Sequence, residues 1–254
     1  MTAYHGGKAR IGEILAKVMY QECIKRDFCP IGYCEPFCGM LGVYQHIVQL
    51  FANMEKICGY KMKYLASDIN TSLILMWKSV QKGWKPPTKM VTEEEFFMLK
   101  YNGQSSAIKG YVGHFYGYMG RYFVPFRHAR TQKESLNQSQ KIIRIAEKLK
   151  QVRFTHGSYK KTSHLKNFII YLDGPYEEFA AYYDEGGKRR TKFDQLEFWD
   201  WCRKMTKHNL LFISAYSAPS DFIEIFSIQS RTTKSPRTER LFMFESNKSH
   251  LNTS

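Results

Sequence analysis

A short, continuous apolar run at residues 168–172 (FIIYL) constrains the fold of this chain more than any other feature. Five successive hydrophobic residues with no polar alternation are typical of a strand that is covered on both faces of a sheet. The run leads directly into an acid, a turn and an aromatic ring: Asp173, Gly174, Pro175 and Tyr176. An ordinary β-turn uses the same residue types, so this stretch alone leaves open whether the strand end is functional.

Other strand candidates alternate with helix candidates along the chain. The expected strands lie at 33–37, 63–68, 151–159, 167–173 and 209–216. Helical spacing follows at 43–51, 72–81 and 142–149, and capping patterns at Thr92 with Glu95 and at Asp194 with Glu197 predict two further helix starts. Strands that alternate with helices predict an α/β protein with a Rossmann-like, doubly wound, mainly parallel sheet.

The charge balance favours a polyanionic partner. Of 254 residues, 38 are Lys or Arg and 23 are Asp or Glu, which gives a formal net charge of +15. Such a chain is drawn to nucleic acid or to an anionic membrane, although a merely basic protein is the alternative. No apolar run reaches the roughly 18 residues of a membrane span, and the N-terminus lacks the apolar core of a secretion signal. We therefore expect an intracellular protein, in cytoplasm or nucleus, with no membrane partner.

The six cysteines are scattered without the dense pattern of a disulfide scaffold, so we expect reduced thiols. Cys34 and Cys38 are four residues apart, but no second Cys or His pair accompanies them. We therefore expect no metal site.

The alternation of strand and helix patterns is interrupted at residues 84–139. This interruption predicts an inserted region. The remaining residues, 1–83 and 140–254, would then form the main α/β domain. Within the insertion, aromatic residues are interleaved with Lys109, Arg121, Arg127 and Arg130. These side chains could stack on bases and neutralise phosphates, or could form a small aromatic core with solvated charges.

A second basic segment, residues 186–193 (GGKRRTKF), follows the strand at 167–173. It contributes Lys188, Arg189 and Arg190 to a glycine-containing loop that could close on a nucleic-acid backbone. A solvated loop is the alternative.

Three acids fall at or near strand ends: Glu35, Asp68 and Asp173. In open α/β sheets ligands bind at the carboxyl ends of the strands, so the three acids together suggest a site. A carboxylate at the end of the second strand is suited to a ribose diol, because it accepts both hydroxyl protons. Gly39 and Gly42 would let a ligand approach the backbone after the first strand.

Four motifs occur in order along the chain: YHGGK at 4–8, EPFCGMLGV at 35–43, SDIN at 67–70 and DGPY at 173–176. Together they resemble the Dam-type DNA adenine-N6 methyltransferases, especially phage and viral members, over nearly the whole chain. The resemblance implies an S-adenosylmethionine cofactor, double-stranded DNA as partner, a catalytic methyltransferase domain at 1–83 and 140–254, and a DNA-recognition region inserted between the SDIN motif and the DGPY motif. The recognised DNA sequence, the oligomeric state and a role in restriction and modification or in evading it do not follow from the sequence.

The resemblance also implies roles for individual residues. It places Tyr4 and Lys8 beside the cofactor, Asp68 on the ribose hydroxyls, and a cofactor loop at Glu35, Pro36, Phe37 and Gly39. The family often has a glycine where this chain has Leu41. Ser158 and Tyr159 match a family position near the adenine pocket only loosely.

The catalytic motif implied by the resemblance is Asp-Pro-Pro-Tyr, in which the carboxylate and a backbone carbonyl accept hydrogen bonds from the target amino group while the Tyr ring stacks on the base. Asp173, Pro175 and Tyr176 match it, and Gly174 departs from it. No Pro-Cys pair, which a cytosine ring-carbon methyltransferase would use, occurs in the chain. The alternatives are a DNA-binding relative whose turnover is impaired through Gly174, or a methyltransferase that acts on RNA or a protein amide.

Overall fold

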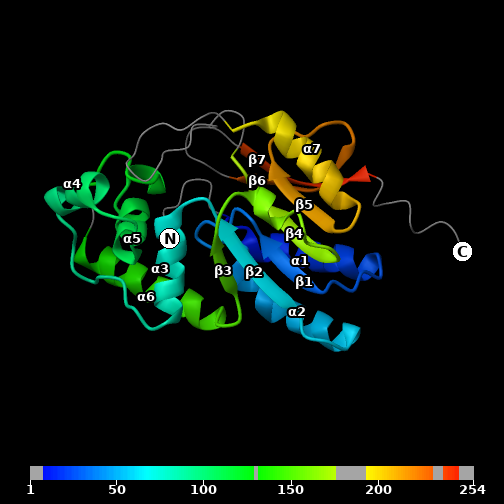
Figure 1. The fold of residues 1–254 in the computed structure, drawn as a ribbon, viewed down its shortest axis with the longest axis horizontal. Coiled ribbons are helices and arrows are strands. Elements are labelled where there is room, and N and C mark those ends of the chain that lie inside the picture. Colours follow the sequence, from blue (N-terminus) through cyan, green and yellow to red (C-terminus); the bar gives the residue numbers. More distant parts are fainter. Residues whose placement is uncertain (1–7, 129–130, 176–192, 231–236, 246–254) are drawn as a thin grey trace, which may run out of the picture.

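A computed structural model describes residues 8–128, 131–175, 193–230 and 237–245 (Figure 1). The first half of the chain forms α1 (Gly12–Lys25), β1 (Gly32–Glu35), α2 (Tyr44–Cys58), β2 (Lys63–Asp68), α3 (Thr71–Gln81), α4 (Glu93–Asn102), α5 (Ala107–Phe115) and the 3₁₀ turn η1 (Tyr118–Gly120). The second half forms α6 (Gln132–Lys148), β3 (Arg153–His156), the 3₁₀ turn η2 (Tyr159–Thr162), β4 (Phe168–Leu172), α7 (Gln195–Thr206), β5 (Leu210–Ala215), β6 (Phe222–Ser230) and β7 (Arg237–Phe244).

The strands form a seven-stranded sheet in the order β3-β2-β1-β4-β5-β7-β6. The first five in this order pair in parallel, whereas β7 lies antiparallel between β5 and β6. The expected mainly parallel α/β sheet is confirmed. The hairpin of β6 and β7 was not predicted.

Strand β4 is buried along its whole length, as its sequence predicts. Ile169 and Tyr171 pack into the core that also contains residues of α1 and α2, whereas Phe168, Ile170 and Leu172 pack into the core beneath α7. Two apolar cores, one on each face, explain why this strand has no polar alternation.

The predicted capping patterns are confirmed. Thr92 and Glu95 form a reciprocal capping box at the start of α4, and the Asp194 side chain accepts the Glu197 amide at the start of α7. Helix α6 begins at Gln132, well before the predicted 142, because a second capping box forms between Thr131 and Glu134. The predicted boundary between residues 139 and 140 therefore falls inside one continuous helix.

Helices α4 and α5 lie at one end of the molecule, with α5 next to α3 (Figure 1). Gly110 of α5 packs directly on the backbone of α3, where a side chain would collide with the Ser72 carbonyl. The aromatic residues of this region are mostly a core: the Phe96 ring lies 4.9 Å from that of Phe123 and 5.2 Å from that of Phe126. The alternative of a small aromatic core therefore holds for these residues.

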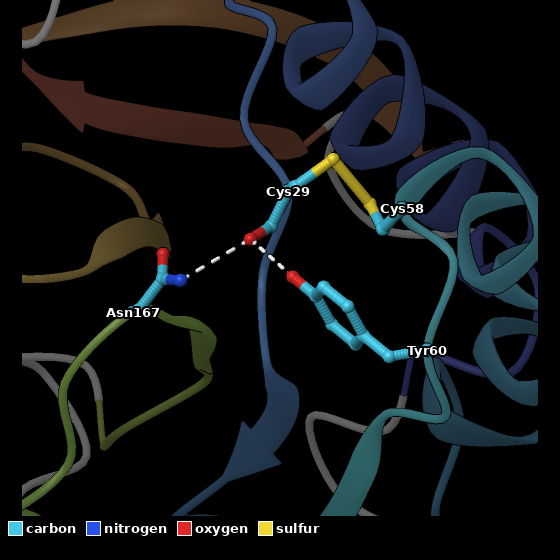
Figure 2. The surroundings of a disulfide bond; sticks show 4 residues. All are labelled: Cys29, Cys58, Tyr60 and Asn167. Atoms are coloured by element: carbon cyan, nitrogen blue, oxygen red, sulfur yellow. Dashed lines mark hydrogen bonds between the residues drawn. A yellow bond between two sulfur atoms is a disulfide. The ribbon is translucent and has the colours of Figure 1, made fainter.

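The expectation that all cysteines are reduced is wrong for one pair. Cys29, before β1, and Cys58, the last residue of α2, form a disulfide with their Cα atoms 5.6 Å apart (Figure 2). The Cys29 carbonyl also accepts hydrogen bonds from the Tyr60 hydroxyl and the Asn167 amide, at 2.7 and 3.2 Å. Packing of α2 against the sheet brings the two cysteines together, which their separation in sequence does not reveal.

The four other cysteines, Cys23, Cys34, Cys38 and Cys202, are free and buried. Within the described ranges no group of three or more His, Cys, Asp or Glu residues could hold a metal ion. In the same part of the chain no helix is long and apolar enough to cross a membrane.

Candidate active site

The three acids expected at strand ends lie along one edge of the sheet. Glu35 ends β1, Asp68 ends β2 and Asp173 directly follows β4, and these strands run parallel. Strand β1 lies between β2 and β4, so the direction of winding reverses between β1 and β4. In open sheets of this kind the ligand crevice lies at that reversal.

Asp68 is tied to the loop after β1. Its Oδ2 accepts the Gly39 amide at 3.1 Å, and its Oδ1 accepts the Asn70 amide at 2.9 Å. Burial raises the pKa of this carboxyl, and hydrogen bonds from these amides oppose the rise. An ionised carboxylate has about four acceptor positions. Asp68 therefore has enough acceptor positions to receive hydrogen bonds from a diol in addition to those from its two amides.

The loop after β1 uses two left-handed residues, Gly39 at φ +46° and Leu41 at φ +58°. Leu41 stands where the resembled family often has a glycine, and it is fully buried. Its side chain therefore contributes to the core while its backbone takes the conformation that a glycine would adopt more readily.

Gly42 allows a close approach, although by the chain itself. A Cβ at this position would lie 3.0–3.1 Å from backbone atoms of Lys8 and Ala9. A Cβ on Gly12 would in turn collide with the Gly42 carbonyl. The space beside Gly42 is therefore filled by the backbone of residues 8–12 and not by the expected ligand. This packing places Lys8 at the crevice.

Lys8 is buried and lies between two carboxylates. Its Nζ is 2.9 Å from Asp173 Oδ1 and 3.4 Å from Oε2 of Glu239 on β7. Burial lowers the pKa of Lys8, but attraction to Asp173 and Glu239 outweighs burial and raises it above the ordinary value. The ammonium is thus a charged partner of the proposed catalytic acid. Glu239 was missed from the sequence because no local pattern marks it.

Glu35 is turned into the protein interior. It is 2% exposed and accepts a 2.7 Å hydrogen bond from the buried Tyr33 hydroxyl. Burial raises its pKa well above the ordinary value, the Tyr33 hydrogen bond lowers it, and the nearby Asp173 raises it further. Glu35 therefore interacts electrostatically with Asp173 from the protein interior. Its own side chain has little exposed surface to contact a ligand.

An aromatic cluster lies beside Gly174, in the segment that the resemblance marks as catalytic. The Phe37 ring stacks on Tyr159 at 5.4 Å and lies 6.1 Å from Phe193. A Cβ added to Gly174 would meet the Phe37 ring at 3.6 Å, an ordinary van der Waals distance. Gly174 therefore has room for a side chain.

A pocket opens next to this motif, on the α7 side of the sheet. It is lined by Gly174 and Pro175, by Gln195, Phe198 and Trp199 of α7, and by Ile213, Ser214, Ala215, Tyr216 and Ser217 at the end of β5. The Gln195 amide donates a 2.9 Å hydrogen bond to the Pro175 carbonyl. The backbone of the motif is therefore anchored to the start of α7.

The predicted DNA-binding residues differ in their surroundings. Lys109 is 4% exposed and its Nζ donates to the Gly103 carbonyl at 2.6 Å, so the prediction that it contacts phosphate is wrong in this conformation. Arg121 and Arg127 are partly exposed, and Arg127 lies 3.4 Å from Glu134. Tyr4, Arg130, Tyr176, Lys188, Arg189 and Arg190 lie outside the described residues.

Comparison with known proteins identifies the family. The family model for the D12 class of N6 adenine-specific DNA methyltransferases matches residues 4–237. The chain belongs to this family. The resemblance to Dam-type adenine methyltransferases is thereby confirmed, and with the sheet topology it makes the fold that of a Rossmann-like methyltransferase.

The other comparisons are more distant. Two structures of the rRNA methyltransferase aviRa from Streptomyces viridochromogenes share 11% identity with this chain, with TM-scores of 0.37 and 0.38. Each comparison covers 92% of this chain and 85% of the other. No curated protein matches.

Proposed function

We propose that this protein transfers a methyl group from S-adenosylmethionine to N6 of adenine in double-stranded DNA. The observation that carries the proposal is the position of Asp173 at the crevice between β1 and β4, where a buried lysine holds its carboxylate. The match to the D12 family supports adenine as the target.

The cofactor would lie over the carboxyl ends of β1 and β2. S-adenosylmethionine supplies a methyl group activated by the adjacent sulfonium. Asp68 would accept the ribose hydroxyls, while Phe37 and the Gly39 loop would form the wall of the site. Tyr4 and Lys8 would border it from the N-terminal segment.

The target amino group would be held by Asp173 and by a backbone carbonyl of the motif, with Gly174, Pro175 and Tyr176 completing the site. An amino nitrogen conjugated to a purine is a poor nucleophile, and accepting hydrogen bonds from it increases the electron density on nitrogen. Gain of the methyl group would be balanced by loss of one amino proton and by departure of the demethylated thioether. The protein would also hold the amino nitrogen in line with the methyl group and the sulfonium, and no covalent intermediate would form on the protein.

Target recognition is proposed for residues 84–139. The adenine must leave the base stack, at a cost of a few kcal/mol that other contacts must offset. Tyr118 of η1 is 57% exposed, and its amide is fixed to the Val124 and Pro125 carbonyls at 2.8 Å. An exposed ring on a well-anchored loop beside Arg121 is suited to stack on bases, while Lys188, Arg189 and Arg190 would contact phosphates.

A second candidate is a DNA-binding relative with weak or no turnover. The observation that favours it is Gly174, because a glycine leaves the motif carbonyl less restrained than the family's proline. Cofactor and DNA binding would then persist while methyl transfer would be slow.

The deciding experiment offers unmethylated DNA, RNA and protein in parallel with methyl-labelled S-adenosylmethionine, followed by chromatography of the digested products. N6-methyladenine in DNA is expected, and Asp173→Ala is the matched inactive control. Label in RNA or protein instead of DNA contradicts the proposal. Cofactor binding by calorimetry without any label transfer supports the second candidate.

A further inference from the structure

Glu239 reaches the catalytic acid from the far end of the chain. Strand β7 runs antiparallel to β5, with Arg240 paired to Ala215, the last residue of β5. The beginning of β7 therefore lies at the edge of the sheet where β4 and β5 end. Glu239 sits at this edge and places its Oε2 3.4 Å from Lys8 Nζ.

The three groups form one charge system. Lys8 carries one positive charge, and the two carboxylates contact it at 2.9 and 3.4 Å. If Asp173 were the only partner of Lys8, the ammonium would neutralise most of the Asp173 charge. Asp173 would then be a weaker acceptor for the hydrogen bonds of the target amino group. A second carboxylate draws part of that attraction away and fixes the ammonium in place, since a buried charge needs partners on more than one side.

A neighbouring ion pair on the same hairpin provides a contrast. Glu224 of β6 contacts Arg240 at 2.9 Å, and both side chains are about two-fifths exposed, at 41% and 37%. Exposed ion pairs of this kind contribute little to the free energy of unfolding. The partner of Glu239, in contrast, is 4% exposed and contacts the catalytic motif.

We propose that Glu239 is a positioning residue for methyl transfer. Glu239 holds the Lys8 ammonium in place, and Lys8 in turn orients the Asp173 carboxylate and partly neutralises its charge. The proposal rests on the proposed function, because it assigns Asp173 to the target amino group. Glu239 acts through Lys8 and is not itself a catalytic residue.

The test compares Glu239→Gln with the matched control Glu224→Gln in single-turnover methylation of DNA. Glu239→Gln should lower the methylation rate by about tenfold or more, the scale on which residues that orient reactive groups act. The affinity for S-adenosylmethionine by calorimetry should stay within about twofold, since Asp68 and the Gly39 loop are unchanged. Glu239→Asp should restore part of the rate, and Glu224→Gln should match the wild type.

A second readout does not depend on activity. The titration of Lys8 Nζ can be followed by NMR, with the signal assigned through its loss in Lys8→Arg. Among the residues that the structure describes, the titratable groups that face Lys8 are Asp173 after β4 and Glu239 on β7, with Glu35 of β1 and Tyr171 of β4 next to Asp173. Both carboxylates that contact Lys8 raise its pKa, so Glu239→Gln should lower that pKa and Glu224→Gln should leave it in place.

The two readouts separate the possible failures. An unchanged rate in Glu239→Gln, or an equal loss in Glu224→Gln, overturns the positioning role. An unchanged Lys8 titration also overturns it, because Glu239 then does not hold the ammonium. If the wild type methylates no DNA while Lys8 still responds to Glu239→Gln, the proposed function fails and the ion-pair arrangement stands.

Discussion

The indole Nε1 of Trp77 donates a 3.0 Å hydrogen bond to the carbonyl oxygen of Gly39, which ties helix α3 to the loop after β1. The amide of the same glycine donates to Asp68. Gly39 is thus held from both sides, and the loop that we propose for the cofactor is anchored before any ligand arrives.

Asp68→Ala should weaken S-adenosylmethionine binding by about 10- to 100-fold, because hydrogen bonds to a charged group contribute about 1.5–3 kcal/mol. Calorimetry measures this, and DNA affinity should change far less. Trp77→Phe is the control: it removes one anchor of the loop and leaves the carboxylate in place. If both variants lose the same affinity, Asp68 acts on the loop and does not touch the ribose.

DNA affinity should fall steeply with added salt, because basic residues that neutralise phosphates release counterions. The slope of log affinity against log salt concentration measures the number of such contacts. Replacing Lys188, Arg189 and Arg190 together with Gln should flatten this slope by about 2 to 3. Lys109→Gln should leave the slope unchanged, because its ammonium is buried on the Gly103 carbonyl. A slope near zero in the wild type would argue against a nucleic-acid partner.

Gly174→Pro should raise the rate of methyl transfer. Proline would restrict the backbone beside Asp173, whereas glycine costs roughly 0.5–1 kcal/mol more to order. The position has room, since the Phe37 ring is 3.6 Å from a Cβ built there. Single-turnover kinetics gives the rate, and calorimetry should give an unchanged cofactor affinity. A lower rate in the variant would mean that the surrounding pocket is adapted to glycine.

Removing the Cys29–Cys58 disulfide should lower the free energy of unfolding by ~3–4 kcal/mol on the loop-entropy account for a separation of 29 residues. Chemical denaturation of Cys58→Ser, with and without reductant, measures this loss. The wild type should lose the same stability when reduced, and the variant should show no further loss. Cofactor affinity should be unaffected, because the disulfide lies before β1 and the proposed site lies after it.

The sequence predicts the central parallel strands β4 and β5 well because they are buried on both faces and carry long apolar runs. Beyond the buried Phe222, the described side chains of β6 are partly buried or exposed without a clean two-residue period, so no such signal marks the hairpin. Asp173 could be found because it directly follows an apolar run, and Asp68 because it closes a predicted strand just before a helical pattern. Glu239 could not, because its role depends on the antiparallel insertion of β7.

Burial was the other feature that could not be read from residue type. Lys109 lies among aromatic residues and basic neighbours, a pattern that suits a phosphate contact, yet its stem and ammonium are enclosed by α5 and the preceding turn. Lys8 carries the same charge and is also enclosed, but there the ammonium meets carboxylates.

The contacts of Lys8 also bear on when the site can form. Lys8 emerges from the ribosome first, Asp173 follows later, and Glu239 comes last, two residues beyond the end of the family match. A nascent chain in which β7 has not yet been synthesised therefore contains Lys8 and Asp173 but lacks Glu239, the second carboxylate that holds the Lys8 ammonium in place. We expect full methyl-transfer competence to appear only after β7 has been synthesised, so that a chain truncated before β7 is an impaired product even where its parallel strands have already paired.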